Sequence, residues 1–346
     1  MGQTRQLLLR QVAIYPQLQI QDVFKFLHQS AFGCEHFVAS LEKATAYIAE
    51  EFATGVSQAQ IEDLDGAYCR VPLCILKSGL TAETFAKLFV ASAKKEETGL
   101  ENLLKKLKIA KEMAGEGLFP FTEEAFSQAL EQWATKGYPA VHHSDTFRQA
   151  YHPAYRVMAK ELALFLPLFT ALDQLPTKAI VAIEGGSASG KTTLSKLIER
   201  LYPCTVFHMD DFFLRPEQRT PERFAQPGGN VDWERFQAEI LQPLSRGESA
   251  NYRRFDCQTM TLGEKIQVIP EGLVVVEGAY SMHPELAKYY DFSVFLQIDP
   301  ALQRQRILHR NGSALAQRFF EEWIPMETAY FEKTEAQNHC DLSITI

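Results

Sequence analysis

Residues suited to hold a triphosphate lie between positions 185 and 192, which read GGSASGKT. This run fits the pattern GxxxxGK[ST], in which small residues let backbone N–H groups turn inward around a phosphate. Lys191 can then reach the β- and γ-phosphates, and the Thr192 hydroxyl can ligate Mg²⁺. A glycine-rich turn without a ligand is the alternative. Because an apolar run at 180–183 precedes the loop and a helical pattern follows it, we favour triphosphate binding.

Acidic residues follow two further apolar runs. Asp210 and Asp211 come directly after 206–209, and Glu277 follows 273–276. The carboxyl ends of parallel strands meet at one edge of a sheet, where ligands bind. We expect Asp210 to accept the proton of an acceptor hydroxyl and Asp211 to cap the next helix. Glu277 is suited to hold Mg²⁺, directly or through water, the alternative being a solvated carboxylate at a strand end.

Three arginines lie in the segment DPALQRQRILHRNG, which is predicted to be helical. Arg306 and Arg310 are four residues apart and therefore share a helix face, with Arg304 nearby. Arginines in this place can close over a triphosphate and stabilise charge on the group in transfer. A solvated basic helix is the alternative.

The elements that would position these residues alternate in the second half of the chain. Helical patterns separate short apolar runs, which predicts a parallel sheet with helical crossovers. The runs predicted as strands are 180–183, 206–209, 273–276 and 292–298.

Helical periodicity prevails in the first half of the chain. The segment 122–134 is an example, with Thr122 as its predicted N-cap. The run 68–76 has the composition of a strand, but Pro72 weakens that interpretation. The predicted fold is α/β, with a P-loop NTPase-type parallel sheet flanked by helices and preceded by a mainly α-helical domain. We place the helical domain, of unknown role, at 1–172, a linker at 173–178 and a P-loop domain at 179–346.

Bulk properties restrict the partners. The chain has 346 residues, a net charge of −8 and 46% hydrophobic residues, as in a soluble globular protein. The negative charge argues against nucleic acid as a partner. No apolar stretch approaches the roughly 20 residues that cross a membrane. Since the six cysteines form no CxxC pair and the N-terminus lacks a signal-peptide pattern, we expect a cytoplasmic protein with reduced thiols.

The motifs of the second half, over about 178–346, resemble the uridine kinase family and its relatives phosphoribulokinase and bacterial pantothenate kinase. The resemblance rests on segments in matching order and spacing: GGSASGKTT, MDDFF, GGNVDWERF, YRRFDCQ, VVVEGAY, DFSVFLQIDPALQRQRILHRNG and EEWIPMETAYF. It implies a phosphotransferase that passes the γ-phosphate of ATP, with Mg²⁺, to an alcohol group of a small metabolite, usually a nucleoside. The first half resembles no family of known activity.

The resemblance also assigns roles by position. Asp210 matches the general base, Glu277 the strand-end acid, and Arg306 and Arg310 the lid arginines. The nucleotide-binding loop comprises Gly185, Gly186, Ser187, Ala188, Ser189, Gly190, Lys191, Thr192 and Thr193. The implied acceptor-binding residues are Asp232, in the segment that grips sugar hydroxyls, and Tyr252, Arg254 and Asp256, in the acceptor-reading hairpin.

Two positions depart from the family pattern. The hairpin keeps Tyr252 but has no histidine, and Asn311 stands where many relatives have an acidic residue. The acceptor is therefore a nucleoside-like molecule or, alternatively, another alcohol such as pantothenate or a sugar derivative. A nucleotide-dependent switch protein is the alternative from another class. The hairpin and lid argue against it, since they favour a closed pocket that excludes water. The sequence leaves open whether the chain forms a homo-oligomer.

Two polar stretches of the first half carry histidines. FGCEHF contains Cys34, Glu35 and His36, and GYPAVHHSDTFRQAYHPAYR contains His142 and His143. Histidine and cysteine are metal ligands, but no HxxxH or CxxC spacing supports a metal site, so we favour capping and buried hydrogen bonding. We expect this domain to shape or sense the acceptor.

Overall fold

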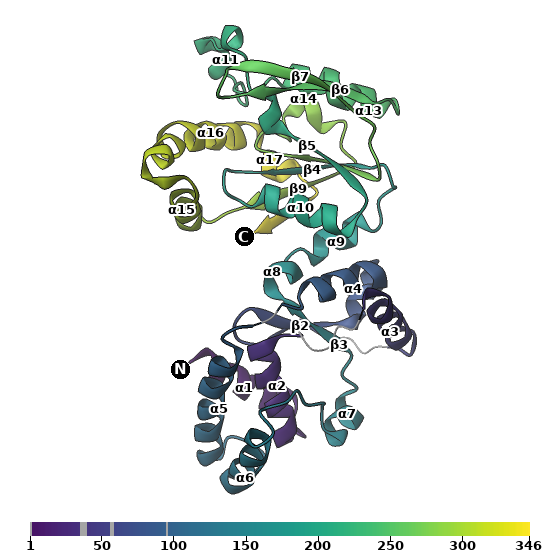
Figure 1. Ribbon diagram of the computed structural model, residues 1–346, viewed down its shortest axis with the longest axis vertical. Helices are drawn as coiled ribbons and strands as arrows, with labels where there is room; N and C mark the ends of the chain where they lie inside the picture. Colours follow the sequence, from purple (N-terminus) through teal and green to yellow (C-terminus); the bar gives the residue numbers. More distant parts are fainter. Residues whose placement is uncertain (1, 35–39, 56–58, 95) are drawn as a thin grey trace. The chain divides into compact units, whose positions relative to one another are not determined.

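The computed structural model describes residues 2–34, 40–55, 59–94 and 96–346. The chain folds into two compact units, Met1–Gln174 and Leu175–Ile346 (Figure 1). Glu35 and His36 lie outside the described residues. None of the described helices has the length and apolar character needed to cross a membrane.

A parallel sheet forms the centre of the second unit (Figure 1). Hydrogen bonds join its strands in the order β10-β9-β4-β8-β5, and every pairing is parallel. The strands are β4 Ile180–Gly185, β5 Cys204–His208, β8 Leu273–Glu277, β9 Phe292–Gln297 and β10 Leu342–Thr345. The two strands β4 and β8 are buried along their whole length, as strands covered on both faces must be. The predicted α/β fold with a P-loop NTPase-type sheet is confirmed.

The central strands end together at their carboxyl edge. Ile183 of β4 and His208 of β5 are both paired in register with Glu277 of β8. The segments that leave β4, β5 and β8 therefore begin side by side, and these segments carry the predicted loop and acids.

Helices flank this sheet and connect its strands. The amphipathic helix α10, Lys191–Leu201, directly follows the loop after β4, and its buried residues include Leu194 and Ile198. The other α-helices are α11 Pro221–Phe224, α12 Trp233–Phe236, α13 Gln242–Ser245, α14 Pro284–Ala287, α15 Pro300–Arg318, α16 Ile324–Thr334 and α17 Ala336–His339. Gly312 interrupts α15 with φ 70° and ψ 169°. An antiparallel hairpin consists of β6 Ala250–Asp256 and β7 Thr261–Val268.

The first unit combines helices with a small antiparallel sheet in the order β1-β2-β3. Its strands are β1 Glu62–Asp63, β2 Tyr68–Pro72 and β3 Tyr155–Ala159. Pro72 is the last residue of β2, where the chain turns into a 3₁₀ helix at Leu73–Ser78. The helices are α1 Gln3–Ile14, α2 Ile20–Phe32, α3 Leu41–Ala53, α4 Ala82–Ala91, α5 Gly99–Gly115, α6 Glu123–Ala134, α7 Asp145–Tyr151, α8 Lys160–Ala163 and α9 Leu166–Leu172.

Buried hydrogen bonding accounts for His143 in the first unit. Its Nδ1 lies 2.8 Å from Oδ1 of Asp22, and its Nε2 lies 2.7 Å from the Tyr155 hydroxyl. Burial lowers the pKa of His143 to about 4, and the hydrogen bond to Asp22 acts in the opposite direction. The ring is therefore neutral, donating through Nδ1 to the carboxylate and accepting from Tyr155 through Nε2.

Candidate active site

The loop between β4 and α10 has the shape of a phosphate cradle. Gly185 has φ +146°, and a Cβ there would lie 2.5 Å from the carbonyl oxygen of Leu296 in β9, so only glycine fits. Gly190, the N-cap of α10, has φ +102°, and a Cβ there would meet nothing within 4 Å. Gly190 precedes the N-terminus of α10, where the first N–H groups of the helix and its dipole favour an anion.

Lys191 folds back over this loop. Its Nζ donates to the carbonyl oxygens of Gly185 at 2.8 Å and Gly186 at 2.9 Å. Within the described part of the chain, the buried Ser189 hydroxyl oxygen has no hydrogen-bond partner. The loop thus holds an ammonium group that can donate to a phosphate oxygen, which fits the predicted triphosphate.

Thr192 and Glu277, the two predicted Mg²⁺ ligands, are in contact. Thr192 Oγ1 donates to Oε1 of Glu277 at 3.1 Å, and Nδ1 of His208 lies 2.6 Å from the same oxygen. The hydrogen bond to Glu277 raises the pKa of His208. Mg²⁺ binds through one or two protein oxygens together with phosphate oxygens and water, so this hydroxyl–carboxylate pair fits it. No group of three or more potential metal ligands gathers among the residues described.

Asp210 lies at the same edge, two residues after the end of β5. Its side chain is open to solvent, yet the protein around the carboxyl group raises its pKa by desolvation. The charges of Lys191 and His208 lower this pKa, and those of Glu277 and Asp211 raise it. A carboxyl group whose proton affinity is raised beside a phosphate loop is placed to act as a general base.

Asp211 does not cap a helix, so that prediction is wrong. A single 3₁₀ turn, Met209–Phe212, follows β5 without a side-chain cap. Oδ2 of Asp211 instead lies 3.2 Å from Nε of Arg254 in β6, because the hairpin packs over this turn. Burial raises the pKa of Asp211, and Arg254 lowers it. This ion pair joins the hairpin to the turn that carries Asp210.

Two of the predicted acceptor residues are buried in the fold. Asp232 is the N-cap of α12, where it accepts from the N–H of Arg235 at 3.2 Å and from Nε2 of Gln218 at 2.9 Å. Tyr252 stacks on Phe212 with ring centroids 5.6 Å apart. Through these contacts, both residues support the segment that carries Asp210 and Asp211.

The other two predicted acceptor residues are exposed. Asp256 forms the hairpin turn, accepting from the N–H of Gln258 at 2.7 Å. Arg254 has a side chain that is 60% exposed beside Asp211, so its guanidinium has donors free to meet a ligand. The structure therefore brings Arg254 to the site and places Asp256 in a local turn.

The two predicted lid arginines have different surroundings. Nη1 of Arg306 donates to the carbonyl oxygen of Ala188 at 3.1 Å, which brings this side chain onto the phosphate loop. Arg310 is exposed, and its Nε donates to Oδ1 of Asn311 at 2.8 Å. The guanidinium of Arg304 lies 4.2 Å from the ring centroid of Phe320.

Sequence reasoning missed Glu184, the residue before the loop. Its carboxylate is fully buried and accepts from the N–H groups of Gly185 at 2.8 Å, Tyr280 at 3.1 Å and Met282 at 2.9 Å. The hydroxyl of Tyr330 in α16 donates to it at 3.1 Å. Burial raises the pKa of Glu184 to about 7, and the backbone hydrogen bonds oppose that shift. An acidic residue inside a buried run was the available signal, because such a charge needs several donors.

Tyr280 was also missed. It has φ +73°, a conformation that is rare for a bulky residue, and it is buried three residues after Glu277, the last residue of β8. The hydrogen bond from its N–H to Glu184 helps to hold this conformation. The strained segment thus stays in contact with the base of the loop.

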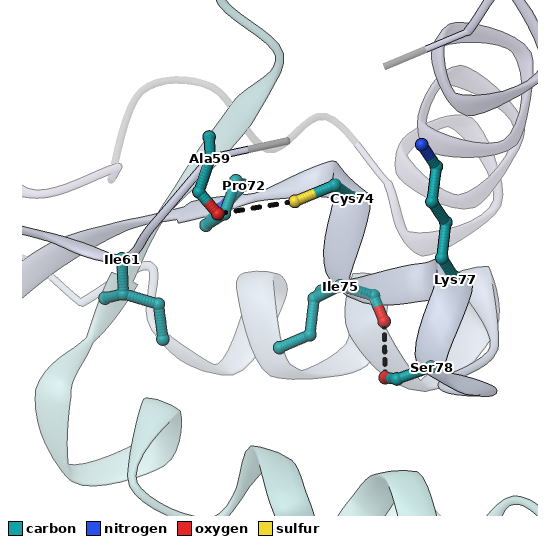
Figure 2. A pocket seen from close by; sticks show the side chains of 7 residues that line it. All are labelled: Ala59, Ile61, Pro72, Cys74, Ile75, Lys77 and Ser78. Atoms are coloured by element: carbon teal, nitrogen blue, oxygen red, sulfur yellow. Dashed lines mark hydrogen bonds between the residues drawn. The ribbon is translucent and has the colours of Figure 1, made fainter. Parts of the chain in front are cut away.

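The first unit has a surface hollow of its own (Figure 2). It has a volume of about 390 Å³ and lies between residues 59–61 and the 3₁₀ helix after β2. Its polar contacts are internal: Sγ of Cys74 donates to the carbonyl of Ala59 at 3.5 Å, and the Ser78 hydroxyl donates to the carbonyl of Ile75 at 2.6 Å. Among the described residues that line the hollow, Lys77 is the one that carries a charge, and we assign no function to the hollow.

Comparison with known proteins points to the same class as the site. No protein-family model matches the chain. A uridine kinase of Brevibacillus brevis is 24% identical over 45% of this chain and 80% of its own length. A probable thymidylate kinase of Pyrobaculum aerophilum is 27% identical over 39% of this chain and 72% of its own length. A solved structure described as a possible uridine kinase from Bacillus stearothermophilus matches 54% of this chain and 99% of its own, with 22% identity and a TM-score of 0.42.

These similarities cover part of the chain at low identity. The curated relatives nevertheless support a uridine kinase-like P-loop kinase, as the sequence motifs indicate. The chain is accordingly similar to nucleotide-binding transferases of the P-loop kinase class.

Proposed function

We propose that the second unit uses ATP and Mg²⁺ to transfer the γ-phosphate to a hydroxyl group of a small, nucleoside-like metabolite. One observation carries the proposal: the phosphate-shaped loop with Lys191, the Thr192–Glu277 pair and Asp210 all lie at the carboxyl edge of one parallel sheet. The similarity to a uridine kinase and a probable thymidylate kinase supports the choice of acceptor class.

Asp210 has the role of general base. As the acceptor oxygen forms its bond to the γ-phosphorus, the bond from phosphorus to the β,γ-bridging oxygen breaks, and the hydroxyl proton passes to the Asp210 carboxylate. The raised pKa suits this role, because a base works best when its pKa lies nearer the working pH.

Positive charge for the transferring group comes from Lys191 and Arg306. Both side chains donate hydrogen bonds to carbonyl oxygens of the loop, and each can turn its donors toward a phosphate. Bound Mg²⁺ would add neutralisation of the β- and γ-phosphate oxygens, held by Thr192 and Glu277. His208 keeps the Glu277 carboxylate in place through its 2.6 Å contact.

On the acceptor side, Arg254 is the residue with donors free to read the substrate, and its ion pair with Asp211 holds it beside the turn that carries Asp210. Its exposed guanidinium can hydrogen-bond an acceptor's oxygens. Tyr252 and Asp232 hold the segment around Asp210 and Asp211 in position, and neither needs to touch the acceptor.

The test is acceptor-dependent ADP release by the purified protein. Nucleosides, pantothenate-like alcohols and sugar derivatives are supplied singly with ATP and Mg²⁺, with Lys191→Ala as the control for loop-dependent turnover. We expect one nucleoside-like acceptor to raise ADP release by at least about tenfold over the acceptor-free rate. A rate that no acceptor changes would contradict a kinase and favour a nucleotide switch, while response to a non-nucleoside alone would overturn the acceptor class.

A further inference from the structure

Ser187 is the third residue of the phosphate loop. Side chains of the helices α15 and α16 form hydrogen bonds with its N–H, hydroxyl and carbonyl groups. Its N–H donates to Oε2 of Glu327 at 2.9 Å, and its hydroxyl donates to Oε1 of the same carboxylate at 2.6 Å. Its carbonyl oxygen accepts from Nε2 of Gln303 at 2.8 Å. Glu327 belongs to α16 and Gln303 to α15, so two helices distant in sequence fix one loop residue.

Helix α16 reaches the end of β4 at a second point. Tyr330 lies three residues after Glu327 and therefore on the same helix face, and its hydroxyl donates to Glu184 at 3.1 Å. Glu327 is 5% exposed and Tyr330 is fully buried. Because Glu184 also accepts from the N–H of Gly185, α16 holds the chain on both sides of Gly186.

The loop conformation needs this support. Ala188, the residue after Ser187, has φ +61°, a left-handed conformation that costs free energy in any residue except glycine. Nη1 of Arg306 in α15 donates to the carbonyl oxygen of Ala188 at 3.1 Å. A strained conformation persists only where its surroundings over-determine it, and here the side chains of α15 and α16 do so.

We propose that Glu327 is a positioning residue of the phosphate loop, which holds Ser187 so that the loop keeps the shape that receives the nucleotide phosphates. The inference rests on the proposed nucleotide binding in this loop. Both carboxylate oxygens are directed at Ser187, and Tyr330 fixes the helix, so Glu327 acts as a support rather than as a competitor for the phosphate site.

The electrostatic setting of Glu327 agrees with a buried support. Burial raises its pKa, whereas the two hydrogen bonds from Ser187 lower it. The charged groups that act on it are Lys191, which favours the carboxylate, and Asp210, which disfavours it. The hydrogen bonds from Ser187 and the charge of Lys191 thus compensate in part for burying the carboxylate.

The test is the affinity for ADP with Mg²⁺, measured calorimetrically on full-length wild type, Glu327→Ala and Glu327→Gln. The amide of Gln can accept from the Ser187 N–H and donate to its hydroxyl, so it preserves both contacts. We expect Glu327→Ala to raise the Kd about tenfold or more, the scale of hydrogen bonds to a charged group, and Glu327→Gln to stay within about threefold of wild type. Glu322→Ala is the matched control, since this nearby glutamate is exposed and paired with Arg318.

Ser187→Ala separates positioning from general stability. It removes one of the two contacts without touching α16, and we expect its Kd to rise about threefold or more. The losses of Ser187→Ala and Glu327→Ala should not add in the double variant, because both remove the same contact. Additive losses, wild-type affinity in Ser187→Ala, or equal or tighter binding by Glu327→Ala would each overturn the inference. Absence of ADP binding by the wild type would instead refute the proposed function.

Discussion

Replacing Asp210 with asparagine separates chemistry from binding at this site. The change keeps the shape of the side chain and removes its ability to accept a proton. Loss of a general base lowers turnover by a factor of about 10² to 10⁴, or roughly 3 to 5 kcal/mol in activation free energy. The contacts of Lys191 with the loop and of Thr192 with Glu277 do not involve Asp210, so nucleotide binding is left intact. We expect kcat to fall by that factor while the Kd for ADP with Mg²⁺ changes by less than about threefold.

The assay is acceptor-dependent ADP release as a function of pH. Because Asp210 must be ionised to act, the wild-type rate falls as pH falls through its pKa, and the raised pKa moves this acid limb above that of an ordinary aspartate. The limb disappears in Asp210→Asn. Asp145→Asn, an exposed position in the first unit, is the control and keeps wild-type kinetics. Near-normal kcat in Asp210→Asn, with the acid limb unchanged, would remove Asp210 from the mechanism.

Three further outcomes follow from contacts in the two units. Lys191→Ala removes the ammonium group of the loop and should weaken ADP binding by about 10- to 100-fold, the scale of hydrogen bonds to charged groups. The Kd is measured by calorimetry, with Lys196→Ala at an exposed position of α10 as the control. An unchanged Kd in Lys191→Ala would mean that the phosphates bind elsewhere. Arg254→Ala should raise the KM for the acceptor about tenfold with the KM for ATP unchanged, and equal changes in both would argue against acceptor reading. His143 is neutral when folded, with a pKa lowered to about 4, so its stabilising contribution is present above the unfolded pKa of 6.5 and is lost as pH falls toward 4. The free energy of unfolding, measured with urea, should decrease by about 3 kcal/mol over that pH range, and His143→Gln should reduce this dependence on pH. An identical pH dependence in the variant would exclude His143 as its source.

The parts of the site that are local in sequence could be predicted from it. The loop after β4 joins a buried strand to an amphipathic helix, so its pattern and flanks lie within about 20 residues of each other. Asp210 and Glu277 were predicted at the same edge because parallel strands align their carboxyl ends. The predicted strands before β10 follow from continuous apolar runs. Strand β10 is shorter and only partly buried at the sheet edge, so it carries a weaker signal.

Contacts between distant segments could not be predicted in this way. Asp211 pairs with Arg254, 43 positions later, and no local pattern distinguishes that pair from a helix cap. Glu327 reaches Ser187 across 140 positions. Asp232 caps α12 through the nearby N–H of Arg235, but its contact with Gln218, 14 positions earlier, depends on how that segment folds. In the first unit, β3 pairs with β2 across more than 80 residues, and its mixed composition conceals it among helical patterns.

An experimental structure of the protein with Mg²⁺ and a non-hydrolysable ATP analogue tests the central claim most directly. We predict that the β-phosphate lies within hydrogen-bonding distance of Lys191 and of loop N–H groups, and that the Asp210 carboxylate faces the γ-phosphate across a space that admits an acceptor hydroxyl. A nucleotide bound away from residues 185–192, or an Asp210 directed away from the γ-phosphate, would contradict the account.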